Sequence, residues 1–154
     1  MHLTTYTDYS LRVLMRLALT PDRLITIAEI ATAYGISEHH LMKVVHQLGV
    51  AGYIETHRGR GGGMRLARNA ADITLGEVVR CMEPHLGLVA CFRQGETCSI
   101  STACALSPIL GEALEAFLAV LDHRSVADLI SGPRQLRGLL KIGPPAQSAP
   151  PDRH

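Results

Sequence analysis

Three closely spaced cysteines are the residues of this chain best suited to chemistry. The chain has 154 residues and four cysteines. Six residues separate Cys91 from Cys98, and five separate Cys98 from Cys104. These gaps are longer than the two-residue gaps of zinc ribbons or of the usual bacterial ferredoxin pattern. A loop with three thiolates can still wrap an iron–sulfur cluster, which is larger than a single ion, and a three-cysteine zinc site is the alternative.

The cellular setting of these thiols follows from the rest of the sequence. No run of 18 apolar residues is long enough to cross a membrane. The N-terminus, MHLTTYTDYS, lacks the basic and then apolar pattern of a secretory signal. We therefore expect a cytoplasmic protein, in which clustered cysteines bind metal or do redox chemistry instead of forming disulfides. The fourth cysteine, Cys81, is expected to be a small buried residue on a preceding helix.

A local excess of basic residues is the second feature with chemical meaning. The formal net charge of the whole chain is only +1. Residues 37–68, however, contain five Lys and Arg side chains against two acidic ones, whereas residues 69–131 are acidic overall. A basic block followed by acidic ones suggests a region that binds a polyanion, joined to a region with another role.

The basic block coincides with a predicted winged helix-turn-helix. Apolar spacing predicts helices over 8–19, 27–34 and 38–50, and Gly35 breaks the period between the last two. Thr7, Thr26 and Ser37 are the expected caps, with Thr26 and Glu29 forming a capping box. Strands follow over 53–57 and 64–67, joined by the turn RGRGGG. An ordinary glycine-rich hairpin is the alternative; a nucleotide-binding loop is disfavoured because no Gly-Lys-Ser/Thr follows.

Candidate DNA contacts lie on the third helix and on the hairpin turn. A recognition helix reads the major groove mainly with its N-terminal half, and arginines suit the minor groove or the phosphate backbone. The outward-facing candidates are Ser37, His39, His40, Lys43, Arg58 and Arg60.

The second half of the chain is predicted to be helical around the cysteine loop. Thr74 opens a short helix that stops at Pro84, a long apolar-striped helix begins near Ser107, and Ser125 opens another. The fold class is thus mainly α with a small β-hairpin: a winged helix-turn-helix plus a long dimerisation helix. The predicted domains are a DNA-binding domain over 1–68, a cluster-binding and dimerisation region over 69–131, and a largely disordered tail over 132–154.

With these motifs together, the sequence resembles the family of winged-helix iron–sulfur transcriptional regulators that includes IscR, RirA and NsrR. The resemblance covers residues 1–131. It rests on the cysteine loop and on the segments LTTYTDYSLRVLMRLAL, ISEHHLMKVVHQLGVAGYIETHRGRGGGMRLAR and DITLGEVVRCMEP. The opening around Asp8 and the LMKVV of the recognition helix are most similar to the nitric-oxide-sensing repressors of the family.

The resemblance implies a homodimer paired through the long helix, with one iron–sulfur cluster per subunit. Cys91, Cys98 and Cys104 fall on the ligand positions of a [4Fe-4S] cluster, with [2Fe-2S] as the alternative. Ser107 stands where IscR-like members have a histidine, so Asp8 of the partner subunit is the candidate fourth ligand. The alternative for Asp8 is an acidic first-turn residue favoured by the helix dipole.

The implied function is a repressor whose affinity for double-stranded operator DNA depends on its cluster, with nitric oxide as the signal. Two alternatives stay open: an iron- or redox-responsive repressor with a two-iron cluster, and a zinc-stabilised DNA-binding module without sensing. We do not expect an enzyme, because neither a nucleophile–base pair nor a nucleotide loop emerges from the sequence.

Overall fold

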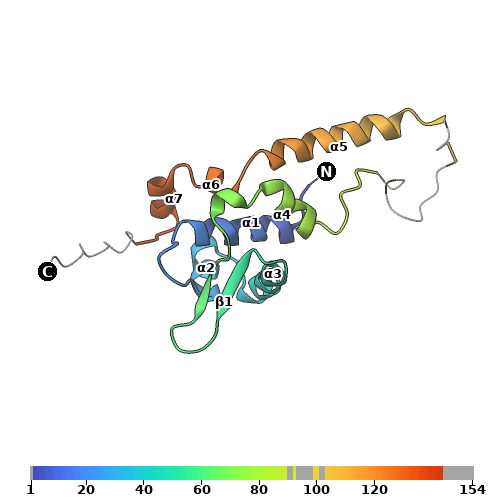
Figure 1. The fold of residues 1–154 in the computed structure, drawn as a ribbon. Helices are drawn as coiled ribbons and strands as arrows, with labels where there is room; N and C mark the ends of the chain where they lie inside the picture. The colour runs from blue at the N-terminus through green and yellow to red at the C-terminus, as the bar shows by residue number, and fades with distance from the viewer. Residues whose placement is uncertain (1, 90–91, 93–98, 101–102, 144–154) are drawn as a thin grey trace.

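The computed structural model describes residues 2–89, 92, 99–100 and 103–143. It confirms a mainly helical fold with one antiparallel hairpin (Figure 1). In chain order the elements are α1 (Thr5–Ala18), α2 (Ile27–Tyr34), α3 (Glu38–Val50), β1 (Ile54–His57), β2 (Gly63–Leu66), the 3-10 helix η1 (Ala70–Asp72), α4 (Leu75–Met82), α5 (Leu106–Asp122), α6 (Val126–Leu129) and α7 (Pro133–Leu139).

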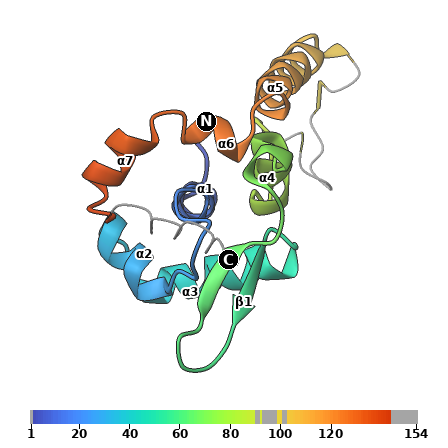
Figure 2. The same cartoon turned by 60° about the vertical axis from the view of Figure 1, so that its left-hand side comes forward.

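Helix α1 lies at the centre of the core. Val13, Leu14 and Leu17 are at most 2% exposed, because the helix packs against α3, α4, α6 and β2. Figure 2 shows α1 end-on, with the other elements of the body around it. The helix begins earlier than predicted, at Thr5, since the side chain of Thr4 accepts the hydrogen bond from the Thr7 backbone and caps it. Thr7, the expected cap, is instead fully buried.

The helix-turn-helix matches its predicted bounds. Thr26 and Glu29 form the predicted capping box at the start of α2, and Gly35 ends the helix with a left-handed φ of 65°. Left-handed backbone favours glycine, so this residue sets the turn into α3. Ser37 occupies the N-cap of α3, but its side chain makes no capping hydrogen bond and therefore stays free for other partners.

The hairpin forms a wing that extends from the body (Figure 1). Its strands pair antiparallel, with Ile54 opposite Leu66 and His57 opposite Gly63. Strand β2 also pairs with the segment that connects α1 to α2. The backbones of Met64 and Ile25 exchange two hydrogen bonds there, of 2.8 and 2.9 Å. The wing is thus held to the helix-turn-helix through its second strand.

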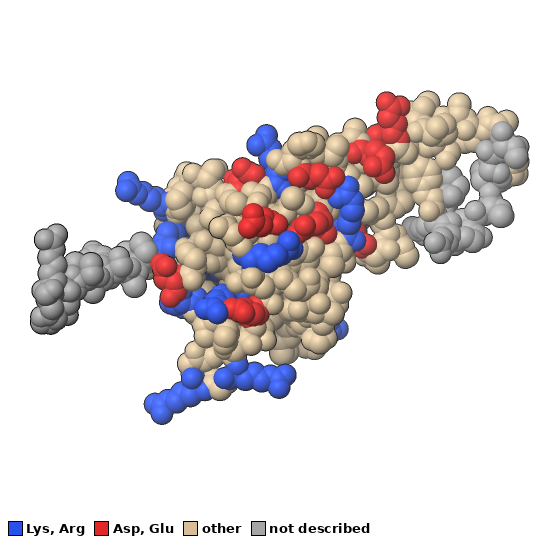
Figure 3. All heavy atoms as spheres, viewed as in Figure 1, with Lys and Arg blue, Asp and Glu red and all other residues tan. Residues whose placement is uncertain are grey.

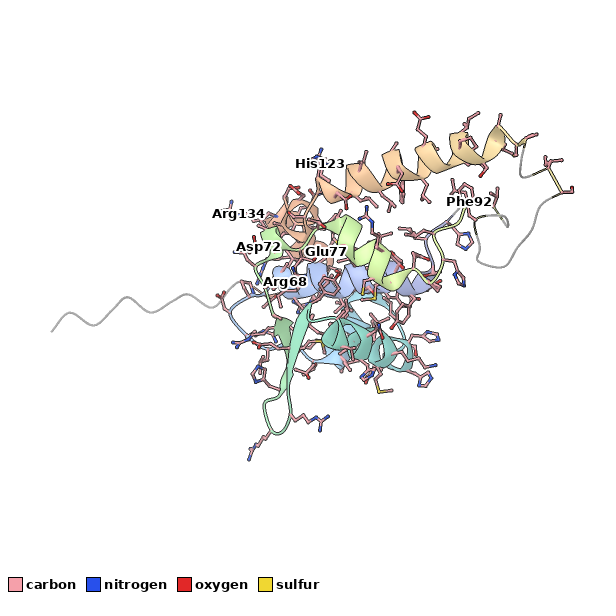
Figure 4. The ribbon with its side chains drawn as sticks, turned by 45° about the vertical axis from the view of Figure 1, so that its right-hand side comes forward. Arg68, Asp72, Glu77, Phe92, His123 and Arg134 are labelled. Atoms are coloured by element: carbon pink, nitrogen blue, oxygen red, sulfur yellow. The ribbon has the colours of Figure 1, made fainter. Side chains whose placement is uncertain are left out.

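Arg68 fixes the base of the wing to α4. Its guanidinium lies 5.2 Å from the ring centroid of Tyr53 and donates to the Glu77 carboxylate at 2.6 Å and to the Asp72 carbonyl at 3.3 Å. Figure 4 labels Arg68, Asp72 and Glu77 in this region. Burial, the largest cause, raises the pKa of Tyr53 to about 12, so the ring stays neutral beneath the cation.

Helix α5 projects away from the body (Figure 1). Leu118 is the one buried residue of this helix, whereas Leu106, Ile109 and Val120 are between 58% and 64% exposed. An apolar helix left this open is typical of an interaction surface. Among the described residues, no helix is both long and apolar enough to cross a bilayer.

Two further features differ from what the sequence predicted. Cys81 is exposed, because α4 turns Val78, Val79 and Met82 into the core and leaves the cysteine on the outer side. Residues 133–139 form helix α7 inside the segment 132–154, which was expected to be largely disordered, and Pro133 is suited to the first turn of this helix. Residues 144–154 lie outside the described part, and the domain boundaries at residues 68 and 131 stay predictions.

Gly63 tests the contact between the wing and the α1–α2 connection. A Cβ at this position would lie 2.9 Å from the Ile25 carbonyl oxygen and 3.0 Å from the Leu24 Cβ. We expect Gly63→Ala to lower the free energy of unfolding by about 1–3 kcal/mol, measured by urea titration, because the backbone must shift. The control Gly49→Ala meets nothing within 4 Å in α3 and should gain about 0.5–1 kcal/mol. Equal stability of the two variants would contradict the contact.

Glu29 makes part of the stability dependent on pH. Burial raises its pKa, but hydrogen bonds from Arg23 and Thr26 outweigh burial and lower the pKa from 4.5 to about 2. Its contribution is therefore complete above pH 4.5 and is lost as the pH falls toward 2. Glu29→Ala should cost about 1 kcal/mol at neutral pH, and this difference should shrink in urea titrations at successively lower pH. If the stability difference between the wild type and Glu29→Ala stayed constant as the pH falls, Glu29 would not be the source of the pH dependence. Glu29→Gln, which keeps the capping hydrogen bonds but does not titrate, is the control.

Candidate functional site

The outer face of α3 carries the predicted major-groove residues. The helix buries one side against the core, through Leu41, Val44, Val45 and Leu48. His39, His40 and Lys43 are consequently exposed, as is Ser37 at the start of the helix. The structure thus brings these four candidates to one end and one side of the helix, with polar atoms free to contact another molecule.

The wing carries the two predicted arginines at its tip. Arg58 and Arg60 are both exposed, and Figure 3 shows basic side chains extending from the end of the hairpin. Arg65 on β2 is bound differently, since it pairs with Glu55 and lowers the pKa of that carboxyl. Among the described ion pairs, neither tip arginine takes part. Both charges are therefore available to a phosphate backbone.

Helix α1 contacts the recognition helix directly. The Tyr6 hydroxyl donates a 3.0 Å hydrogen bond to the Lys43 carbonyl oxygen, and the ring of Tyr9 lies 6.5 Å from that of His40. The sequence reasoning missed Tyr6, since a tyrosine on an amphipathic helix carries no sign of what its hydroxyl meets. The hydrogen bond ties the position of α3 to that of α1.

Met42 is a second residue that the sequence reasoning missed. It is 50% exposed on α3, beside Lys43, and it lines a shallow hollow with His46 and Val50. Apolar side chains in this position suit the methyl group of thymine. The helical period could have indicated Met42, because it falls outside the buried stripe of α3.

The cysteine region is described only in part. Cys104 is a free, half-exposed thiol just before α5, and Cys91 and Cys98 lie outside the described residues. Within the described residues, no three His, Cys, Asp or Glu side chains come together as a metal site. The available donors nevertheless fit an iron–sulfur cluster chemically, since a free thiol at Cys104 and an accessible carboxylate at Asp8 are both suitable ligands.

Asp8 lies in the first turn of α1 and is partly open to solvent. Its carboxylate accepts from the Arg12 guanidinium at 3.0 Å, and its side chain is 47% exposed. The pair is one helical turn apart, a spacing that contributes only a few tenths of a kcal/mol on an exposed helix, roughly 0.3–0.5. Asp8 is thus held weakly and can take another partner at low cost.

The start of α1 is bonded to the base of the cysteine loop. The backbone N–H and the hydroxyl of Thr4 both donate to one oxygen of Glu83, at 2.7 and 3.1 Å. Glu83 ends α4, and the chain then runs toward the cysteines. Helix α1 therefore connects this base, through Thr4, to the recognition helix, through Tyr6.

Comparison with known proteins agrees with this architecture. The family model Rrf2, described as an iron-dependent transcriptional regulator, matches residues 3–132. The HTH-type transcriptional regulator NsrR of Geobacillus kaustophilus is 52% identical over 143 residues, 92% of this chain and 97% of that protein. NsrR of Bacillus subtilis is 50% identical over 144 residues, 92% and 99% of the two chains.

Solved structures show the same winged-helix fold. CymR, the global cysteine regulator of B. subtilis, superposes with a TM-score of 0.72 at 26% identity, covering 85% of this chain and 97% of that one. IscR of T. potens has a TM-score of 0.66 at 24% identity, over 84% and 86%, which is a likeness of fold alone. The protein is a DNA-binding regulator and not an enzyme. With a family model covering most of its length and relatives near 50% identity, the chain belongs to the Rrf2 family of transcriptional regulators.

Proposed function

We propose that this regulator is a cytoplasmic repressor that binds operator DNA as a homodimer and releases it when nitric oxide damages an iron–sulfur cluster. Cys91, Cys98 and Cys104 would hold the cluster, a [4Fe-4S] cluster in our proposal, together with Asp8 of the partner subunit. The family model, described as an iron-dependent transcriptional regulator, and the relatives named NsrR support a regulator that uses iron. When bound, the cluster supplies iron, the atom with which nitric oxide reacts.

One observation carries the proposal: α1 links the candidate sensing residues to the DNA-reading face. The helix carries Asp8, its start is bonded to Glu83 at the base of the cysteine loop, and its Tyr6 hydroxyl holds the Lys43 carbonyl. Val13, Leu14 and Leu17 bury the rest of α1 in the core. A displacement of its first turn would therefore be passed to α3.

Arg12 gives Asp8 a second partner. In the present structure the carboxylate pairs with Arg12 of its own chain; as a ligand it would turn to the other subunit. Exchange between these two partners would shift the first turn of α1, and with it the backbone of Lys43. Such a switch works only if the two arrangements differ in affinity for DNA, because a ligand that favours neither shifts nothing.

The exposed face of α5 supports dimerisation. Leu106, Ile109 and Val120 offer apolar side chains on a helix that the rest of the chain leaves largely uncovered. Pairing of this helix with its copy would bury them and would present two recognition helices. A dimeric helix-turn-helix protein reads two half-sites related by symmetry. The localised basic face would thereby be doubled.

Substitution of the two wing arginines tests whether the wing contacts DNA. We expect Arg58→Gln and Arg60→Gln each to weaken operator binding and to reduce the slope of log affinity against log salt by about 0.9 for each phosphate that is no longer neutralised. Gel-shift titrations at several salt concentrations measure both effects. Arg124→Gln, an exposed arginine between α5 and α6, is the control and should keep the wild-type slope. An unchanged slope in both wing variants would remove the wing from the interface.

Substitution of Asp8 tests whether this residue is a ligand of the proposed cluster. In anaerobically purified protein, Asp8→Ala should alter the absorption and electron paramagnetic resonance spectra of the cluster and lower its iron and sulfide content. Asp22→Ala, an exposed aspartate in the turn after α1, should leave all three unchanged. Wild-type spectra in Asp8→Ala would exclude Asp8 as a ligand. The iron and sulfide content of the wild type also separates [4Fe-4S] from [2Fe-2S] and from zinc.

A further inference from the structure

A groove between α1, α2 and the segment after α7 contains a buried cation that the proposed function does not use. Arg16 is only 3% exposed, although it is charged. Its Nη1 donates to the Thr20 hydroxyl at 2.5 Å, but its Nε has no hydrogen-bond partner in the described structure. A buried guanidinium normally has a counter-charge, because desolvation of an unpaired ion costs several kcal/mol.

Arg16 lines one part of an open groove of about 560 Å³. Arg23, Glu29 and Thr32 line it from the turn before α2 and from α2 itself, and residues 139–143 line it from the C-terminal side. The groove is thus large enough for a small ligand, and Arg16 forms part of its lining although the residue is almost fully buried.

Arg137 builds the C-terminal side of this groove. Its guanidinium donates to the Leu19 carbonyl at the end of α1 and to the Gly143 carbonyl beyond α7. These two bonds hold the segment after α7 across the end of α1. The groove is therefore a product of the tertiary fold, since its two sides are more than a hundred residues apart in the sequence.

The charge around the groove is strongly positive. Arg16, Arg23 and Lys141 line it, Arg137 adjoins it, and Glu29 is the one carboxylate among the described lining residues. Glu29 is bound to Arg23 at 2.7 Å, so it does not pair with Arg16. Burial, and then the charge of Arg23, lower the pKa of Arg16 and outweigh the opposite effect of the Glu29 carboxylate.

We propose that this groove binds a phosphate group, with Arg16 and Arg23 as its main donors. Guanidinium groups bind phosphate oxygens through paired, charge-assisted hydrogen bonds. The excess of cations over carboxylates matches a dianion, such as inorganic phosphate or a phosphate monoester, better than a single carboxylate. The Nε of Arg16 is buried and lacks a hydrogen-bond partner, so a phosphate oxygen that reached it would satisfy an unpaired donor. Neither the cluster nor nitric oxide enters this inference.

The test follows the Arg16 Nε–H signal in nitrogen-15 NMR spectra of the full-length protein. Inorganic phosphate and glycerol phosphate are titrated separately, with chloride holding the ionic strength constant. We expect a saturable shift of the Arg16 signal with one of them at least, and the tighter one identifies a free anion or a monoester as the ligand. Loss of the signal in Arg16→Lys assigns it. Absence of a saturable shift with both anions would overturn the proposal.

Charge variants of two other lining residues, exposed Arg23 and half-buried Glu29, test the site without replacing the buried Arg16. Arg23→Gln should weaken binding about tenfold or more, the effect of losing one charge-assisted hydrogen bond. Glu29→Gln should strengthen binding, because it removes the one carboxylate and keeps the capping bonds. Arg134→Gln, on α7 (Figure 4) and outside the groove lining, should match the wild type.

Two further results would overturn the phosphate site. One is equal affinity in Arg23→Gln and Arg134→Gln, which would show that the shift comes from general screening. The other is a shift of the Arg16 signal with operator DNA only, which would assign the groove to the DNA backbone. Cluster spectra and nitric oxide response are unaffected by either result, so failure here and failure of the proposed function are distinguishable.

Discussion

The burial of α1 is the constraint on which the rest of the molecule depends. Val13, Leu14 and Leu17 pack at the centre of a small core and leave almost no surface to solvent. Fully burying a side chain of this kind contributes about 1.5–3 kcal/mol, and the same helix contacts the recognition helix, the second wing strand, α4 and α6. The proposed DNA-reading face and the base of the cysteine loop therefore share one rigid support.

Polar side chains at the two ends of α1 connect this helix to the regions with proposed functions. At its start, Thr4 is bonded to Glu83, and close by Tyr6 reaches the backbone of the recognition helix. At its other end, the almost fully buried Arg16 forms part of the lining of a basic groove. A packed core does not deform continuously, so α1 moves as a unit. Hydrogen bonds from α1 to Glu83 and to the Lys43 backbone would therefore pass a small displacement of one element to the other. Asp8, the proposed cluster ligand, and Arg16, a proposed phosphate donor, both lie on this helix.

Local sequence signals predicted most of the DNA-binding half. Capping residues such as Thr26 and Glu29, the break at Gly35 and the apolar period of α3 are short-range features, and the helices they predict lie where expected. The start of α1 was missed because Thr4 caps it while also binding Glu83, a residue far along the chain. The exposure of Cys81 was missed because a cysteine in a mostly apolar helix looks like a core residue.

The remaining features depend on contacts that no local pattern encodes. The Tyr6 hydroxyl finds its acceptor 37 residues away, and the groove at Arg16 exists only because Arg137 bonds to Leu19. In sequence alone, a buried arginine on an amphipathic helix looks like an ordinary surface charge. The cluster ligands were inferred from resemblance and cysteine density, and they stay predictions.

The most direct test of the account is the affinity of the anaerobic, cluster-containing protein for operator DNA, measured by titration before and after nitric oxide is added. We expect tight binding before exposure, and a large loss of affinity afterwards that accompanies the change in the cluster spectrum. A cluster spectrum that changes while DNA affinity stays the same would contradict the claim that α1 couples the cluster to the recognition helix.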